Sequence, residues 1–156
     1  MNFTLDDNAP PLIYLPGAWG VQLDGDLVLS SFFGGTYHAA QVNGASVNMS
    51  LVGTDVYLWG SKGPKHVRFL LMSCSHAFDD VDALLLRVVQ GNFSVQYDGN
   101  IAFLSAHAPT MQYQQLLFHV AFNASSTHFV SLKAVLDDEN NWLDLDFITF
   151  TDSTYG

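Results

Sequence analysis

Residues 92–105 have the sequence NFSVQYDGNIAFLS, in which two alternating segments flank a turn. Side chains of a β-strand point alternately to its two faces, so the alternation of Asn92–Tyr97 predicts a strand with one buried face. Asp98, Gly99 and Asn100 then supply the positive φ angles that a tight hairpin turn needs. Ile101–Ser105 is the expected returning strand, and this β-hairpin indicates the fold class.

Short segments of the same kind continue in both directions, separated by Gly, Pro and Asn-Gly signals. Residues 5–11 predict a turn-rich lead-in. The other predicted strands are Leu12–Leu15, Leu27–Phe33, Thr36–Ala40, Ala45–Leu51, Asp55–Trp59, Leu116–Phe122, Phe129–Leu136 and Trp142–Phe150. Strands at this spacing predict one all-β domain, a jelly-roll-like antiparallel β-sandwich.

Composition agrees with one globular β domain. The chain has 156 residues, 49% of them hydrophobic and only 13% charged, which excludes intrinsic disorder. Among the acidic residues only Glu139 is a glutamate, and aspartate favours turns over helix interiors. Fifteen acidic residues against five basic ones give a net charge of −10. Nucleic acid and anionic membrane surfaces are therefore excluded as partners, because both attract cations.

Residues 67–90 form a segment of different composition. These 24 residues contain no Gly, Pro, Asn, Thr or Tyr, and they include the only cysteine, Cys74. Their internal charges make them a poor membrane span. The segment begins with Val-Arg and ends with Gln, so its codons can start with GT and end with AG without changing the reading frame. We consider two hypotheses for this insertion: a translated retained intron, and a genuine loop or short helix.

Outside this insertion the sequence resembles a known kind of extracellular domain. The resemblance rests on DDNAPPLIYLPGAW, SSFFGGTYHAAQVNGASVNMSLVGTDVYLWGSKGP, FSVQYDG, QLLFHVAF and WLDLDFITF. These motifs resemble a domain of basidiomycete fungi found in single-pass membrane proteins, often as two copies before a transmembrane helix. More loosely, they are similar to galactose-binding-like β-sandwiches, including the carbohydrate-binding modules of glycosidases. The resemblance implies a β-sandwich that binds glycans.

The chain departs from this family in the insertion, in an acidic segment at 127–141, and in lacking a membrane helix after Gly156. No secretory signal peptide begins the sequence. We expect the mature part of an extracellular or cell-surface protein, without leader or anchor. Four Asn-x-Ser/Thr sequons agree with that location and predict glycosylation at Asn2, Asn48, Asn92 and Asn123.

The aspartates of the last predicted strand are candidates for a cation site. Alternation places Asp144 and Asp146 on the face that also carries Ile148, so Asp146 should approach the core, where a bare charge is costly. The resemblance implies that such an aspartate can bind a structural Ca²⁺ together with an acid near the N-terminus, here Asp6 or Asp7. The metal candidates are thus Asp146, Asp144 and Asp7. Alternatively, Asp146 accepts backbone N–H bonds from the N-terminal segment.

Aromatic residues near strand ends predict the ligand-binding site. Exposed rings stack on the apolar faces of sugars, and neighbouring polar groups bond the hydroxyls. Trp142 with Asn141 and Asn140 is the first candidate, supported by Trp19, Tyr37 and His38. Trp19 and Trp59 could instead plug the ends of the sandwich, and Trp142 could pack inward.

Catalysis is not expected. The sequence has no GxSxG, HExxH or P-loop motif, and its six histidines lack metal-ligand spacing. We therefore expect a non-catalytic binding module for cell-wall or surface glycans. The alternative is a structural or adhesive ectodomain that contacts protein partners. Exposed tryptophans would favour glycans, and a broad apolar patch would favour protein contact.

Overall fold

The computed structural model describes residues 1–22, 25–64, 92–138 and 141–152. Its strands are β1 (Asn2–Asp6), β2 (Ile13–Tyr14), β3 (Trp19–Val21), β4 (His38–Ala40), β5 (Ser46–Lys62), β6 (Phe93–Tyr97), β7 (Asn100–Leu104), β8 (Gln112–Ala134), β9 (Asp144–Leu145) and β10 (Phe147–Thr151). Two 3₁₀ turns, η1 (Leu29–Ser31) and η2 (Phe33–Gly35), precede β4.

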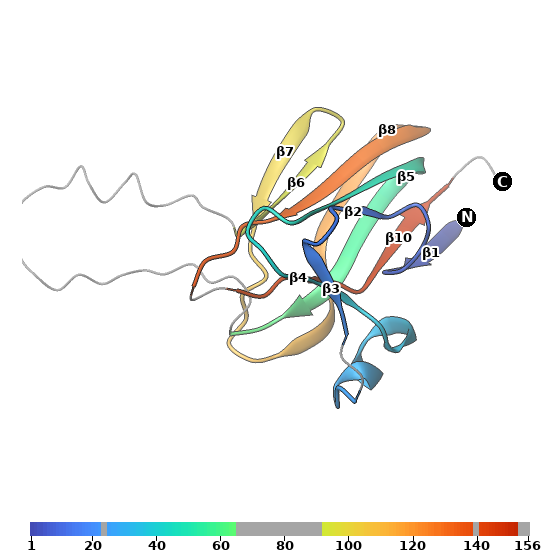
Figure 1. The fold of residues 1–156 in the computed structure, drawn as a ribbon. Coiled ribbons are helices and arrows are strands. Elements are labelled where there is room, and N and C mark those ends of the chain that lie inside the picture. Colours follow the sequence, from blue (N-terminus) through green and yellow to red (C-terminus); the bar gives the residue numbers. More distant parts are fainter. Residues whose placement is uncertain (23–24, 65–91, 139–140, 153–156) are drawn as a thin grey trace, which may run out of the picture.

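The fold is an antiparallel β-sandwich of the jelly-roll kind, built on a folded ribbon of β5 and β8. Both strands are long, and both bend near their middle, where Gly53 and Asp55 pair with Ser126 and Ala121 across a large irregularity. In Figure 1 the teal half of β5 runs to one end of the molecule and the green half runs back. The ribbon therefore contributes to both layers of the sandwich.

Pairing on either side of the bend defines the two layers. The first layer consists of β2, the first half of β5, the second half of β8, β6 and β7. The second layer consists of β1, β10, the second half of β5 and the first half of β8. A small sheet, β3-β4-β9, adjoins the second layer, since β9 leads into β10 through Asp146.

The core fills the space between the layers. Alternate residues of the first half of β5 are buried, and alternation resumes after the bend. Gly53 is required at the bend, because a Cβ there would lie 2.5 Å from the carbonyl oxygen of Thr151. Among the fully buried side chains of the ribbon are Val47, Met49, Val56, Leu58, Val130 and Leu132.

The structure confirms the hairpin at 92–105. Tyr97 pairs with Asn100, and the two turn residues Asp98 and Gly99 have φ angles of 42° and 84°. The Asp98 carboxylate accepts the backbone N–H of Phe129 at 3.0 Å, which ties the turn to β8.

Several expected strands differ from those observed. Residues 27–33, expected as a strand, form η1 and the start of η2, where Gly34 and Gly35 have positive φ angles. Residues 142–150 are two strands in different sheets rather than one. The two strands expected in 45–59 are one bent strand, and the expected lead-in contains the end of β1.

The segment 67–90 lies outside the described residues, so neither hypothesis for the insertion is tested. In the part of the chain that the structure describes, no helix has the length and apolar character to cross a membrane.

Candidate functional site

Trp19 and His38 point from the small sheet toward the interior. Residues opposite one another in antiparallel strands project to the same face. Trp19 lies opposite Ala40 and His38 lies opposite Leu145, and both of these partners belong to the main core. The ring of Tyr14 stacks on His38 with a centroid distance of 4.2 Å and meets Trp19 edge-on at 5.3 Å.

Tyr37 and Trp142 lie on the other face of the small sheet, in a second apolar cluster built on Phe32 and Ala39. Their ring centroids are 5.8 Å apart. The Tyr37 hydroxyl donates to Asp26 at 2.8 Å, and burial together with this carboxylate raises the pKa of Tyr37 to about 12.

The structure therefore does not bring all of these residues together on one face, because the small sheet separates Trp19 and His38 from Tyr37 and Trp142. Asn141 is exposed beside Trp142, and Asn140 lies outside the described residues. All three tryptophans are half-buried with a bound indole N–H. These N–H groups donate to the Ser46 carbonyl (Trp19, 3.0 Å), the Thr149 hydroxyl (Trp59, 3.0 Å) and the Asp144 carboxylate (Trp142, 2.6 Å).

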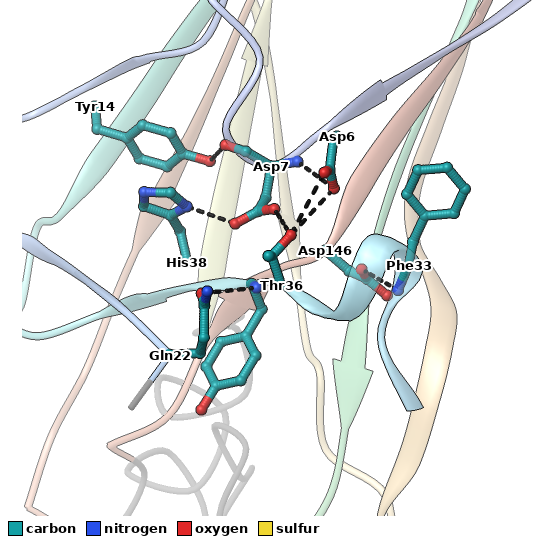
Figure 2. A network of polar contacts seen from close by, with 9 residues as sticks. Asp6, Asp7, Tyr14, Gln22, Phe33, Thr36, His38 and Asp146 are labelled. Atoms are coloured by element: carbon teal, nitrogen blue, oxygen red, sulfur yellow. Dashed lines mark hydrogen bonds and ion pairs between the residues drawn. The ribbon is translucent and has the colours of Figure 1, made fainter. Parts of the chain in front are cut away.

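Asp7 is the centre of a buried polar network. Figure 2 shows its carboxylate between the ring of His38 and the hydroxyl of Thr36, at 2.6 Å and 2.5 Å. The Tyr14 hydroxyl donates to the Asp7 carbonyl oxygen at 2.6 Å. Burial, and then the Asp7 and Asp6 carboxylates, raise the pKa of Tyr14, and burial with the Asp7 side chain raises that of Asp6. The network joins the end of β1 to β4.

Asp146 is buried and only partly satisfied. Its Oδ1 accepts the backbone N–H of Phe33 at 2.8 Å, and its Oδ2 has no hydrogen-bond partner among the described residues. Burial raises the pKa of Asp146 to about 7, and the charges of Asp144, Asp7 and Asp6 act in the same direction. Asp146 thus accepts a backbone N–H, as the alternative interpretation expected, but the donor belongs to η2 and not to the N-terminal segment.

The expected calcium ligands are not gathered into one site. No three His, Cys, Asp or Glu side chains of the described residues are placed to hold a metal ion. Asp144 accepts the N–H of Ser61 at 2.6 Å, the Ser61 hydroxyl and the Trp142 indole, whereas Asp7 bonds its own network. As placed, Asp7, Asp144 and Asp146 do not fit a calcium ion.

A row of aromatic rings lies on the outer face of the second layer, and we call Phe33, Phe147 and Trp59 the aromatic strip. Trp59 and Phe147 are opposite residues of β5 and β10 whose rings stack at 5.4 Å with planes 7° apart. Phe33 of η2 continues the row at 5.0 Å from Phe147, and Leu116 of β8 lies opposite Trp59 at its other end. Phe33 and Leu116 are 40% and 39% exposed, so the row reaches solvent.

A second row of more polar residues runs beside the strip, two positions away from it on β5 and β10. It consists of Thr4, Thr149, Tyr57 and His119, and we call it the polar row. Tyr57 and His119 stack at 4.2 Å, and His119 lies 3.4 Å from the Asp55 carboxylate. Residues two apart on a strand are separated by about 6.6–6.8 Å. One ring-sized ligand can therefore contact both rows.

No prediction from the sequence covers this surface, although the alternation of its strands carries a signal for it. In Asp55–Trp59 the residues Asp55, Tyr57 and Trp59 share one face, and in 147–151 Phe147 and Thr149 do. The place of Phe33 carried no such signal, because its N–H bonds Asp146, 113 positions away in sequence.

Ser126, His128 and Asp98 resemble a nucleophile–base–acid set in geometry. Ser126 Oγ lies 3.0 Å from His128 Nε2, and Nδ1 contacts the Asp98 carboxylate. Nε2 also lies 3.0 Å from the carbonyl oxygen of Ala124. Burial lowers the pKa of His128, but the bonds to Asp98 and Ala124 outweigh this and raise it. These contacts fasten the bend of the ribbon.

The four sequons differ in accessibility. Asn2 and Asn123 are exposed, Asn48 is half-buried on the first layer, and Asn92 is buried.

The fold is similar to parts of several carbohydrate-active enzymes. These include a family two carbohydrate esterase from Cellvibrio japonicus (14% identity, TM-score 0.57, 98% of this chain and 34% of that one). They include a two-domain esterase active on acetylated mannans, co-crystallised with mannopentaose (11% identity, TM-score 0.59, 99% of this chain and 38% of that one). They also include an exo-β-1,3-galactanase from Phanerochaete chrysosporium with galactose (13% identity, TM-score 0.50, 96% of this chain and 29% of that one).

The chain thus spans about a third of the length of these structures. At this identity the likeness shows the jelly-roll fold. The sequence matches no protein-family model and no curated protein.

Proposed function

We propose that this chain is a non-catalytic extracellular module that binds cell-wall or cell-surface glycans through the aromatic strip and the polar row. The observation that carries the proposal is the row of stacked rings beside hydroxyl, phenol and imidazole groups on one sheet face. A sugar has apolar C–H faces and a polar rim, so it matches a surface with both characters. The carbohydrate-active neighbours of the same fold support this choice.

The location of the proposed site on regular strands also favours binding. Strands hold side chains more precisely than loops do, and η2 is fixed by the Phe33 N–H bond to Asp146, the residue that precedes β10. The extracellular location is part of the same proposal, with Asn2 and Asn123 as the accessible glycosylation positions and the basidiomycete surface proteins as the family of origin.

A glycan array on the isolated chain, followed by calorimetric titration of the strongest hit, tests the proposal. Phe33→Ala should weaken binding about tenfold, because aromatic anchors dominate small interfaces. The matched control is Phe129→Ala, since Phe129 is equally exposed (42% against 40%) but lies on the first layer. Near-ultraviolet circular dichroism checks that both variants are folded. Unchanged affinity in Phe33→Ala would place the site elsewhere, and no glycan bound at all would reject the function.

One observation favours the rival function, protein contact. The outer face of the first layer carries well-exposed apolar side chains on β2, β5, β7 and β8. They are Ile13, Val52, Ile101, Phe103 and Phe129. Such a face is typical of a surface that meets another protein.

A further inference from the structure

Among the strands that the structure describes, β7 lies at the edge of the first layer. It pairs with β6 on one side, and no other strand of the described residues pairs with it. An edge strand presents unpaired backbone groups to which another strand can bind.

The hairpin turn fixes which backbone groups of β7 face outward. In a hairpin with a two-residue turn the closing pair is hydrogen bonded, and bonded pairs then alternate with non-bonded pairs. Tyr97 and Asn100 close this turn, so Ala102 bonds to β6 whereas Ile101 and Phe103 do not. The N–H and C=O groups of Ile101 and Phe103 therefore point to the free edge.

The side chains of the same two residues are exposed. Ile101 and Phe103 are each 56% exposed and share the outer face, while Ala102 and Leu104 pack against the core. Natural proteins protect edge strands with lysine, proline or a bulge. The sequence Asn-Ile-Ala-Phe-Leu of β7 contains no charge and no proline, and its pairing with β6 is regular.

We propose that β7 pairs with β7 of a second copy of this chain, antiparallel and about a two-fold axis at Ala102. In this register Ile101 lies opposite Phe103 of the second copy, and Phe103 lies opposite its Ile101. Both pairs are bonding positions, so the contact forms four backbone hydrogen bonds and two aromatic–aliphatic pairs. The two first layers become one continuous sheet.

A second copy fits this edge better than an unrelated strand for two reasons. The two outward-bonding residues are placed symmetrically about Ala102, which is the self-complementarity that a two-fold contact requires. Each chain also carries a net charge of −10, and β7 is an uncharged five-residue strand where two such molecules can approach.

The contact is small, so the dimer should be weak and concentration-dependent, with a Kd on the order of 100 µM. It uses the edge of the first layer and leaves the aromatic strip on the second layer free in both copies. A dimer would therefore present two copies of that face.

Sedimentation equilibrium of the full chain, from about 10 µM to about 1 mM, tests the proposal. The wild type should shift reversibly from monomer to dimer, and Phe103→Lys should weaken the association at least tenfold. Phe103→Pro should do the same, because proline removes an outward N–H and leaves the bonds to β6 intact. The matched control is Phe129→Lys, on an interior strand of the same face, which should dimerise like the wild type.

Three results would overturn this pairing. The wild type could remain monomeric throughout, the dimer could survive both Phe103 variants, or Phe129→Lys could be as disruptive as Phe103→Lys. The last result would assign association to the sheet face and not to the edge.

Discussion

Asp146 has two opposing effects on the stability of the fold. It fixes Phe33 through a backbone hydrogen bond, yet one of its oxygens is buried without a partner. A carboxylate in that position is costly when ionised, which is why the pKa rises to about 7.

The pH dependence of stability should reveal this carboxyl group. The folded state holds its proton more tightly than the unfolded state, whose pKa is near 3.8, so this group lowers the free energy of unfolding as pH rises from about 4 to about 7. Asp146→Asn cannot ionise and should be more stable than the wild type at about pH 8, with little difference near pH 4. Urea unfolding at both pH values measures it. The calcium expectation predicts the opposite result. Asp146→Asn would then be less stable than the wild type, and calcium, but not EDTA, would stabilise the wild type.

Trp142 is a structural residue by its contacts, and substitution should show it. Its indole N–H is one of the donors that satisfy the fully buried Asp144. Trp142→Phe keeps an aromatic ring but removes this donor, which should lower the free energy of unfolding by about 1–3 kcal/mol. Trp59→Phe is the matched control, since its N–H bonds a hydroxyl of a half-buried residue and should cost less. Unchanged stability with lost glycan binding would restore Trp142 as a ligand contact.

At the level of elements, the local sequence pattern predicts those elements whose structure depends on local interactions. The hairpin at 92–105 was predicted because its alternation and its turn residues lie within a few positions of each other. Residues 27–33 were predicted as a strand because they are apolar, but the chain turns there at Gly34 and is anchored by a distant carboxylate. The change of sheet at Asp146 likewise depends on partners far away in sequence.

The candidate site was predicted less well than the fold. Aromatic type and nearness to a strand end do not determine exposure, and the residues that share them lie on both faces of the small sheet. The register that brings Trp59, Phe147 and Phe33 together involves three separate segments. The sequence alone does not show which strands pair with one another, so it cannot reveal such a register.

The bend of the ribbon is sensitive to the addition of a single carbon atom at Gly53. Gly53→Ala would place a methyl group 2.5 Å from a backbone oxygen of Thr151, and backbone cannot move aside cheaply. We expect a loss of about 1–3 kcal/mol in the free energy of unfolding. Val52→Ala, at the exposed neighbouring position, should change it by less than about 0.5 kcal/mol. Equal effects of the two substitutions in chemical denaturation would contradict the close approach.

At the level of the whole molecule, the two layers divide the surface into two faces of different character. The second layer carries rings beside hydrogen-bonding groups, and the first carries scattered apolar side chains that end at an unprotected edge. The proposed glycan site and the proposed self-association therefore use different parts of the surface, and a substitution at one should leave the other unaffected.

The pairing of β1 with β10 has a consequence for biosynthesis. Within this chain, Asn2–Asp6 is synthesised long before Phe147–Thr151, its one pairing partner among the strands that the structure describes. At about 5–20 residues per second, β1 waits on the order of 7–30 s for its partner. During translation the nascent chain therefore exposes a strand that has no partner yet, and a chaperone or a slow codon between the two strands would act on that interval.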